Sequence, residues 1–246
     1  MNYTYYDDTK KNLFLFIILP ILMNILFAGF YFSGIDSLQQ IISPNNGFLT
    51  RESGVLEQLQ NLYLLTIFIM FSYLSVKRSV KGEKILFGFI SILFLFLFLE
   101  EIDYGINLYE FFMDTNSINE VRNWHNESAN GKKQNVHYFK QLIDLANVIW
   151  FIIIPLIISK IKVPFIKSLA PHRFFIIGFL LTAILSSVTH SLDDIGLSII
   201  NGAGGSLAGN ISEFREHNTY YLYLLYAIQI ANTKLTLSFK TKKQSI

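Results

Sequence analysis

The sequence predicts an all-α, polytopic helical membrane protein, with residues 1–246 forming a single transmembrane domain. Of its 246 residues, 52% are hydrophobic, including 23 Phe, and only 15% are charged, whereas about 25% charge is usual in a soluble domain. Apolar windows of roughly 17–25 residues, each long enough to cross about 30 Å of hydrocarbon, recur along the whole chain. These observations together predict about six transmembrane helices.

Six apolar segments are the expected spans. The first follows Lys10 and Lys11 and resembles the apolar region of a signal peptide. Its apolar run is long and no A-x-A cleavage site follows it, so we expect an uncleaved span. The third and sixth reach spanning length only with their polar ends included. The expected spans cover residues 13–32, 55–76, 85–99, 142–159, 174–189 and 220–231.

The connections between these spans differ in character. Residues 102–136 are expected to form an outer interfacial segment, because INLYEFFMD has the amphipathic pattern of a short helix at the membrane surface. Residues 195–212 contain the Gly-rich stretch NGAGGSLAGN, which predicts a flexible loop. Residues 234–246 are expected to form a basic cytoplasmic tail.

Lysine and arginine predict the orientation of the chain. Fourteen of the 20 basic residues fall in the termini and connections on one side, which is therefore expected to be cytoplasmic and to carry both termini. Asp7, Asp8 and Glu83 are the only cytoplasmic members among the 18 acidic residues. The expected location is a bacterial inner or plasma membrane, crossed several times, with the acids on its outer face.

Ionisable groups mark five outer helix ends. In RESGVLEQLQN, at the start of the second span, Gly54, Glu57, Gln58 and Asn61 lie at i, i+3, i+4 and i+7, on one helix face. The other four ends read FLFLFLEEIDYG, HYFKQLIDLAN, THSLDD and SEFREHNTYY. Because an ionisable group at membrane depth costs roughly 2.5–3.5 kcal/mol, the shared pattern predicts that these ends line one cavity opening outward.

Glu100 and Glu101 are the most informative acids. They end a helix, where negative charge is unfavourable, so the helix dipole does not explain them. Glu52, Glu213 and Glu216 lie near helix starts, where the dipole does favour acids. We therefore expect Glu100 and Glu101 to line the cavity.

The candidate chemistry is that of carboxylates and imidazoles. Because the chain has no cysteine, its ligand set suits zinc, manganese or iron bound by oxygen and nitrogen, and such a metal can activate a bound water. The spacings match neither HExxH nor paired Glu-x-x-His motifs, so only the constellation indicates a metal. The candidate catalytic residues are Glu57, Glu100, Glu101, Asp193, Asp194 and Glu213, and the candidate metal ligands are Glu101, His125, His190, Glu216 and His217.

Three stretches resemble a family of bacterial multi-pass proteins of no established activity. RESGVLEQLQN, LEEIDYGINLYEFF and NEVRNWHNES are similar to its E-x-G-x-x-E helix start, its EEISWGQ-like helix end and its N-L-H-N loop. Asp103-Tyr104 replaces Ser-Trp, Ile106 replaces Gln and Trp124 replaces Leu. The resemblance covers about residues 50–128 and implies that the matching residues share one site. These are Glu52, Gly54, Glu57, Glu100, Glu101, Gly105, His125 and Asn126.

Three functions are compatible with this pattern. The first is a metal-dependent membrane enzyme, a hydrolase or transferase acting from the outer face on a lipid or lipid-linked substrate. The second is a cation or proton transporter or channel with an acidic outer vestibule, and the third is a non-catalytic subunit that docks a partner protein or forms a homo-oligomer. Membrane lipid is an expected partner and nucleic acid is not. A transport path requires polar residues toward the cytoplasmic side, and these are few: Asn24, Thr66, Ser72, Ser75 and Ser91.

Overall fold

The computed structural model describes residues 8–31, 55–105, 141–194 and 207–233, together with isolated positions between 33 and 38. All regular elements in these ranges are helices, which confirms the predicted all-α class. The main elements are α1 (Thr9–Leu13), the π-helical turn η1 (Phe14–Ile18), α2 (Leu19–Tyr31), α4 (Val55–Lys77), α5 (Lys81–Glu101), the 3₁₀ turn η3 (Asp103–Gly105), the π-helical turn η4 (Val148–Ile153), α8 (Ile154–Ile157), α9 (Pro164–Leu169), α10 (Phe174–Asp194) and α11 (Leu207–Asn232).

Three helices are long and apolar enough to cross a membrane: Thr9–Phe30, Val55–Lys77 and Lys81–Glu101. Large apolar side chains point outward from them; Ile25 and Ile92, for example, are 62% and 64% exposed. Such a surface is compatible with hydrocarbon and would promote aggregation in water, so the chain is a membrane protein. Two shorter apolar helices are Gln141–Ile157, which includes η4 and α8, and Phe174–Leu185.

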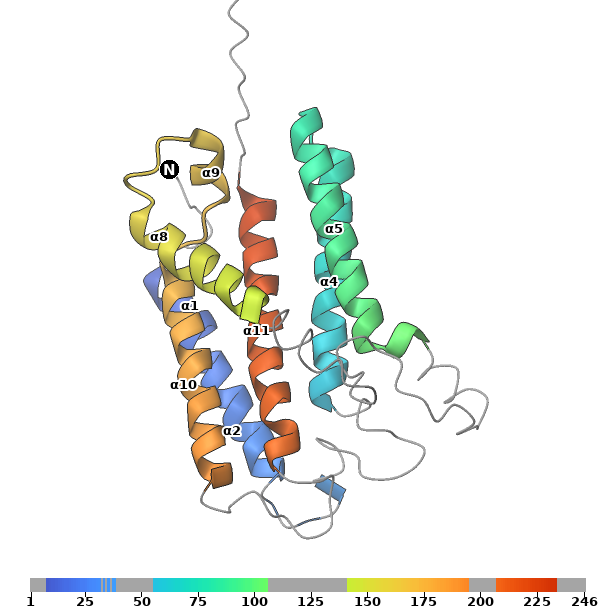
Figure 1. Ribbon diagram of the computed structural model, residues 1–246, viewed down its shortest axis with the longest axis vertical. Coiled ribbons are helices and arrows are strands. Elements are labelled where there is room, and N and C mark those ends of the chain that lie inside the picture. Colours follow the sequence, from blue (N-terminus) through green and yellow to red (C-terminus); the bar gives the residue numbers. More distant parts are fainter. Residues whose placement is uncertain are drawn as a thin grey trace, which may run out of the picture.

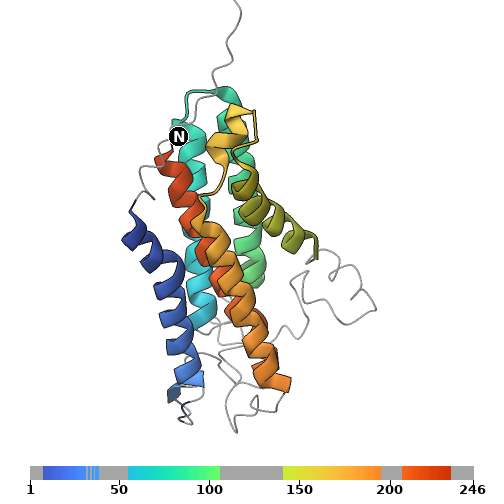
Figure 2. The same ribbon diagram turned by 90° about the vertical axis from the view of Figure 1, so that its left-hand side faces the viewer.

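Helix α11 lies at the centre of the bundle. The antiparallel pair α4 and α5 lies on one side of it, and α2 and α10 lie on the other (Figures 1 and 2). At one end of the bundle, α1 begins, α11 ends and α4 turns into α5 between Lys77 and Lys81; we call it the basic end. At the opposite end, α5 and α10 end while α4 and α11 begin, and we call this the acidic end.

Helix α11 starts earlier than the sequence suggests. It begins at Leu207, inside the stretch 195–212 that the sequence predicts to be a loop. The reason is that the polar residues before the apolar run, such as Glu213, Arg215 and Glu216, are adequate helix formers, so the helix continues beyond its apolar part. Residues 106–136 of the predicted interfacial segment and the tail 234–246 lie outside the described residues.

Apolar side chains fill the half of the α4–α5–α11 interface nearer the basic end. Phe71 and Phe87 lie 5.8 Å apart between ring centroids, and Phe71 and Phe94 lie 6.1 Å apart in a stacked arrangement. Each such aromatic side chain buries a large apolar area. The buried members of this cluster are Ile67, Phe71, Leu74, Phe87, Leu169, Ala227 and Ile230.

Two hydrogen-bonded contacts fix the register of neighbouring helices. Between α4 and α5, the hydroxyls of Ser72 and Ser91 lie 2.6 Å apart, and the Ser91 hydroxyl also donates to the carbonyl of Phe68. Between α2 and α11, the buried amides of Asn24 and Asn218 bond reciprocally, at 2.9 and 3.2 Å. Polar groups paired in this way join helices within hydrocarbon.

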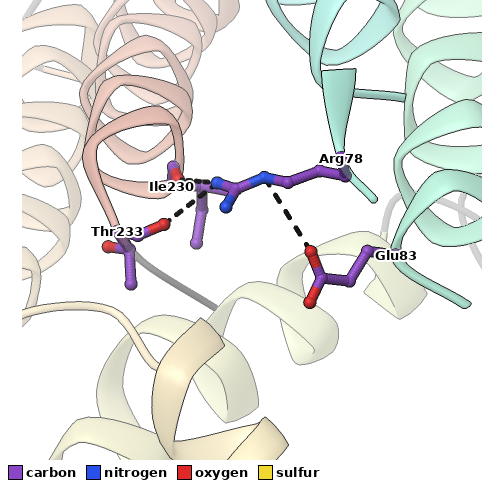
Figure 3. A network of polar contacts seen from close by, with 4 residues as sticks. All are labelled: Arg78, Glu83, Ile230 and Thr233. Carbon is purple, nitrogen blue, oxygen red and sulfur yellow. Dashed lines mark hydrogen bonds and ion pairs between the residues drawn. The ribbon is translucent and has the colours of Figure 1, made fainter. Parts of the chain in front are cut away.

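The basic end holds an arginine that joins three helices. Nη2 of Arg78 donates to the carbonyls of Ile230 (3.2 Å) and Thr233 (3.0 Å), at the end of α11, and its Nε lies 3.9 Å from a carboxylate oxygen of Glu83 on α5 (Figure 3). A cation at a helix C-terminus complements the helix dipole and the unpaired carbonyls there. Arg78 therefore holds the α4–α5 turn against the end of α11.

Candidate functional site at the acidic end

The central contact of the acidic end joins α5 to α11. The hydroxyl of Tyr220 on α11 donates a hydrogen bond of 2.7 Å to Oε1 of Glu101, the last residue of α5. Both side chains are partly buried. A hydrogen bond from a hydroxyl to a carboxylate is stronger than one between two neutral groups. This contact therefore offsets part of the cost of placing a negative charge at the C-terminus of α5.

Glu100 has a second tyrosine as its donor. Its side chain is 5% exposed and accepts a hydrogen bond from the hydroxyl of Tyr104 in the turn that ends α5. This bond raises the pKa of Tyr104 to about 12, so its hydroxyl keeps its proton. Tyr104 has φ 54° and ψ 27°, a left-handed conformation that is uncommon for a residue other than glycine, and Gly105 follows with φ 87°. The turn therefore holds the tyrosine back over the end of its own helix.

Glu216 and Glu57 add carboxylates at the same end. Glu216 precedes Tyr220 by one turn on the same face of α11, and its charge acts on the Tyr220 hydroxyl. Glu57 lies in the first turn of α4 and is partly buried. Thus the acidic end gathers carboxylates from α4, α5 and α11, three of the five helix ends that the sequence singles out.

The helix Gln141–Ile157 is attached to α11 by polar side chains. The Tyr223 hydroxyl donates to Oδ1 of Asn147 at 2.7 Å, and Nη1 of Arg215 lies 3.6 Å from Oδ2 of Asp144. The ion pair is largely exposed and contributes little to stability. This helix starts beside the middle of α11 (Figure 1), and through Asp144 the HYFKQLIDLAN stretch contacts Arg215 of the SEFREHNTYY stretch.

His217 packs against aromatic side chains of α2 and α4. It is 1% exposed, and its ring centroid lies 5.2 Å from that of Phe27 on α2 and 5.4 Å from that of Tyr63 on α4. Its Nδ1 is buried without a hydrogen bond. Because successive residues of a helix point about 100° apart, Glu216 and His217 face different neighbours, although the sequence places both on one stripe.

Several predicted site residues are described only in part. His190, Asp193 and Asp194 belong to the last turns of α10, and Glu213 belongs to the first turns of α11, but their side chains lie outside the described part of the structure. His125 lies outside the described residues altogether. At the level of the backbone, the ends of α10 and α11 both reach the acidic end (Figure 1).

A metal centre is not formed by the described residues alone. Among them, no three His, Asp or Glu side chains lie close enough together to hold one ion. The described arrangement instead pairs Glu100 and Glu101, the two carboxylates at the end of α5, each with a tyrosine hydroxyl. The sequence places Tyr104 one turn after Glu100 and Tyr220 one turn after Glu216. This spacing is a signal that the tyrosines and glutamates share helix faces, but it does not identify the two hydroxyls as the donors to Glu100 and Glu101.

Comparison with known protein families, curated proteins and solved structures finds no match to this chain. The resemblance of its motifs to a bacterial multi-pass family therefore stays a prediction. The fold and the outward apolar surface define a helical membrane protein, and its function has to be inferred from the acidic end.

Proposed function

We propose that the chain is a multi-pass protein of a bacterial cell membrane, with about six spans, and that its acidic end is the active site of a hydrolase or transferase. Its substrate is a lipid or lipid-linked molecule that enters from the outer face. The observation that carries this proposal is the bond between Tyr220 and Glu101, because it holds a carboxylate at membrane depth in one orientation.

The chemistry supported by this pair is proton transfer at a fixed carboxylate. In a hydrolysis step, the oxygen of water adds to the acyl or phosphoryl centre of the lipid while Glu101 accepts the proton of that water. The bond to the leaving oxygen then breaks, and the same proton passes to that oxygen. In a transferase, the hydroxyl of an acceptor takes the place of water. Tyr220 is a positioning residue, since it acts through Glu101.

No step is assigned to a metal, because the described donors do not form a metal site. Zinc, manganese or iron remains part of the proposal only if residues beyond the described ranges, such as His125, complete the ligand set. Elemental analysis of the purified protein tests this directly. One equivalent of a divalent metal that is lost from a His125→Ala variant would support a metal-dependent reaction.

The closed basic half of the bundle supports an enzyme over a channel. The polar residues that a transport path would use are engaged within the bundle instead. Thr66 donates to the carbonyl of Leu62, Ser75 donates to that of Ser72, Ser72 pairs with Ser91 and Asn24 pairs with Asn218. Aromatic and aliphatic side chains pack between α4, α5 and α11 in that half of the bundle.

The test is an unbiased search for lipid turnover. Wild-type protein and Glu101→Gln are placed in nanodiscs made from a total bacterial lipid extract, and lipids are followed over time by mass spectrometry. Glu83→Gln, which changes a buried glutamate at the basic end, is the matched control. We expect product with wild type and Glu83→Gln, and a loss of 100-fold or more, on the order of a lost general base, with Glu101→Gln. Equal lipid profiles with and without the protein would contradict the proposal.

A further inference from the structure

A buried amide oxygen on α4 has no hydrogen-bond partner among the described residues. Asn61 on α4 is 9% exposed, and its Oδ1 is buried without a hydrogen bond. A buried polar atom that lacks a partner costs free energy, and a membrane supplies no water to relieve this cost. An orphaned acceptor of this kind suggests a ligand that brings a donor.

The serine contact between α4 and α5 places Asn61 at the level of Glu101. Asn61 lies about three turns before Ser72, on the same side of α4. Because α5 runs in the opposite direction, the position about three turns beyond Ser91 is Ile102, next to Glu101. The Asn61 side chain therefore lies on the α5 side of α4, at the end of α5.

The contacts between α4 and α11 place Tyr220 at the same level. Leu56 packs in one cluster with Phe214, and Tyr63 lies 6.0 Å from Tyr221 between ring centroids. The two helices run in the same direction, so Tyr220 falls beside the turn of α4 that carries Asn61. Three helices thus bring an amide, a carboxylate and a hydroxyl to one level.

The groups at this level accept hydrogen bonds. The hydroxyl proton of Tyr220 is already donated to Glu101, and the nearby cation, Arg215, is paired with Asp144. The acceptor atoms are the carboxylate oxygens of Glu101 and Glu216 and Oδ1 of Asn61. A complementary ligand is cationic and carries several N–H donors, as a primary ammonium does.

We propose that the acidic end binds a primary ammonium group, carried by a lipid headgroup, through Glu101, Glu216 and Asn61. The proposal rests on the function proposed above and names the substrate class of that site. A protonated amine supplies three N–H donors and one positive charge. It satisfies the Asn61 oxygen and neutralises part of the charge that the acidic residues place at the membrane surface.

The experiment compares lipids that differ only in the methylation of their amine. Binding of dioleoyl phosphatidylethanolamine, its N,N-dimethyl derivative and the corresponding phosphatidylcholine to the detergent-purified protein is measured by native mass spectrometry. We expect affinity to fall along this series as N–H donors are lost, by about tenfold or more from the first to the last. Asn61→Leu and Glu101→Gln should reduce this preference to less than about threefold.

Free ethanolamine serves as the second arm. Competition by millimolar ethanolamine, but not by choline, supports recognition of the amine itself. A lipid preference that ethanolamine does not disturb supports an amine recognised only on its lipid. Equal affinity for the three lipids, or a preference unchanged in both variants, would overturn the proposal. The wild-type series decides this even if a variant fails to fold.

The lipid-turnover experiment and this binding experiment can contradict their proposals independently of each other. Turnover of an amine-free lipid would leave the enzyme in place and remove the ammonium proposal. Selective binding of the primary amine without turnover of any lipid would retain the binding site and remove the enzyme.

Discussion

Asn24 and Asn218 hydrogen bond to each other through both of their amide groups, across the interface of α2 and α11. The two residues are 8% and 3% exposed, and each amide also donates to a carbonyl of its own helix, four residues earlier. This pair fixes the register of the first helix against the central one.

Replacing Asn24 by Leu is expected to lower the free energy of unfolding by about 1–2 kcal/mol, because it leaves the Asn218 amide unpaired in an apolar surround. The double variant Asn24→Leu/Asn218→Leu should lose less than the sum of the two single variants. Unfolding in mixed micelles by titration with SDS measures these changes. Asn232→Ala, at an exposed position, is the control, and additive losses from the two single variants would contradict the pair.

Gly178→Ala is expected to destabilise the protein by about 1–3 kcal/mol through overpacking. A Cβ at Gly178 would lie 2.7 Å from Cδ2 of Leu222 on α11 and 3.3 Å from Cδ1 of Phe16. Gly29, in α2, has no such neighbour within 4 Å, so Gly29→Ala should be neutral or stabilising by up to about 1 kcal/mol. Thermal unfolding of the two variants in one nanodisc preparation tests the difference. A Gly178→Ala protein as stable as wild type would show that α10 does not approach α11 this closely.

Ser72→Cys/Ser91→Cys is expected to form a disulfide under mild oxidation, because the two hydroxyls lie 2.6 Å apart and a disulfide needs facing side chains at close range. The chain has no cysteine of its own, so there is no background reaction. Labelling with a maleimide after oxidation should fail for this pair and succeed for Thr66→Cys/Ser91→Cys. Free thiols in Ser72→Cys/Ser91→Cys would contradict the α4–α5 register from which we infer that Asn61 lies at the level of Glu101.

Arg78→Met is expected to loosen the end of α11, since it removes two hydrogen bonds to the carbonyls of Ile230 and Thr233. Loss of a helix cap worth about 1 kcal/mol corresponds to roughly fivefold faster hydrogen exchange of the amides near residues 230–233. Arg78→Lys should fall between wild type and Arg78→Met, because the charge remains but the planar fork is lost. Lys77→Met, which removes the neighbouring cation, should leave hydrogen exchange near residues 230–233 unchanged. If Lys77→Met accelerates this exchange as much as Arg78→Met does, the loss of positive charge alone explains the acceleration, and the hydrogen bonds of Arg78 do not.

The sequence predicts the helices better than it predicts their contacts. Apolar windows place a helix over each expected span, because length and hydrophobicity are local properties of the chain. Membrane crossing by the shorter helices stays a prediction. The early start of α11 at Leu207 does not follow from the sequence pattern, because the Gly-rich stretch that contains Leu207 is typical of a loop.

At the acidic end, periodicity gives the face on which a residue lies but not the neighbour it meets. Glu101 and Tyr220 were both placed on helix faces pointing into a common cavity, and the structure joins them by a hydrogen bond. His217 was assigned to the same stripe as Glu216, but it lies against Phe27 and Tyr63 instead. Which aromatic residue fills which gap depends on helix packing, and a single sequence does not reveal that.

The most direct test of the central claim, that α5 and α11 form one site at the acidic end, is a double-mutant cycle on Glu101 and Tyr220. The free energies of unfolding of wild type, Glu101→Gln, Tyr220→Phe and the double variant are measured in one lipid environment. Tyr73→Phe, at an outward-facing position of α4, controls for the loss of a hydroxyl. We predict a coupling energy of about 1–3 kcal/mol between the two residues. A coupling energy of zero, within about 0.3 kcal/mol, would show that the carboxylate and the hydroxyl do not meet and would contradict the site.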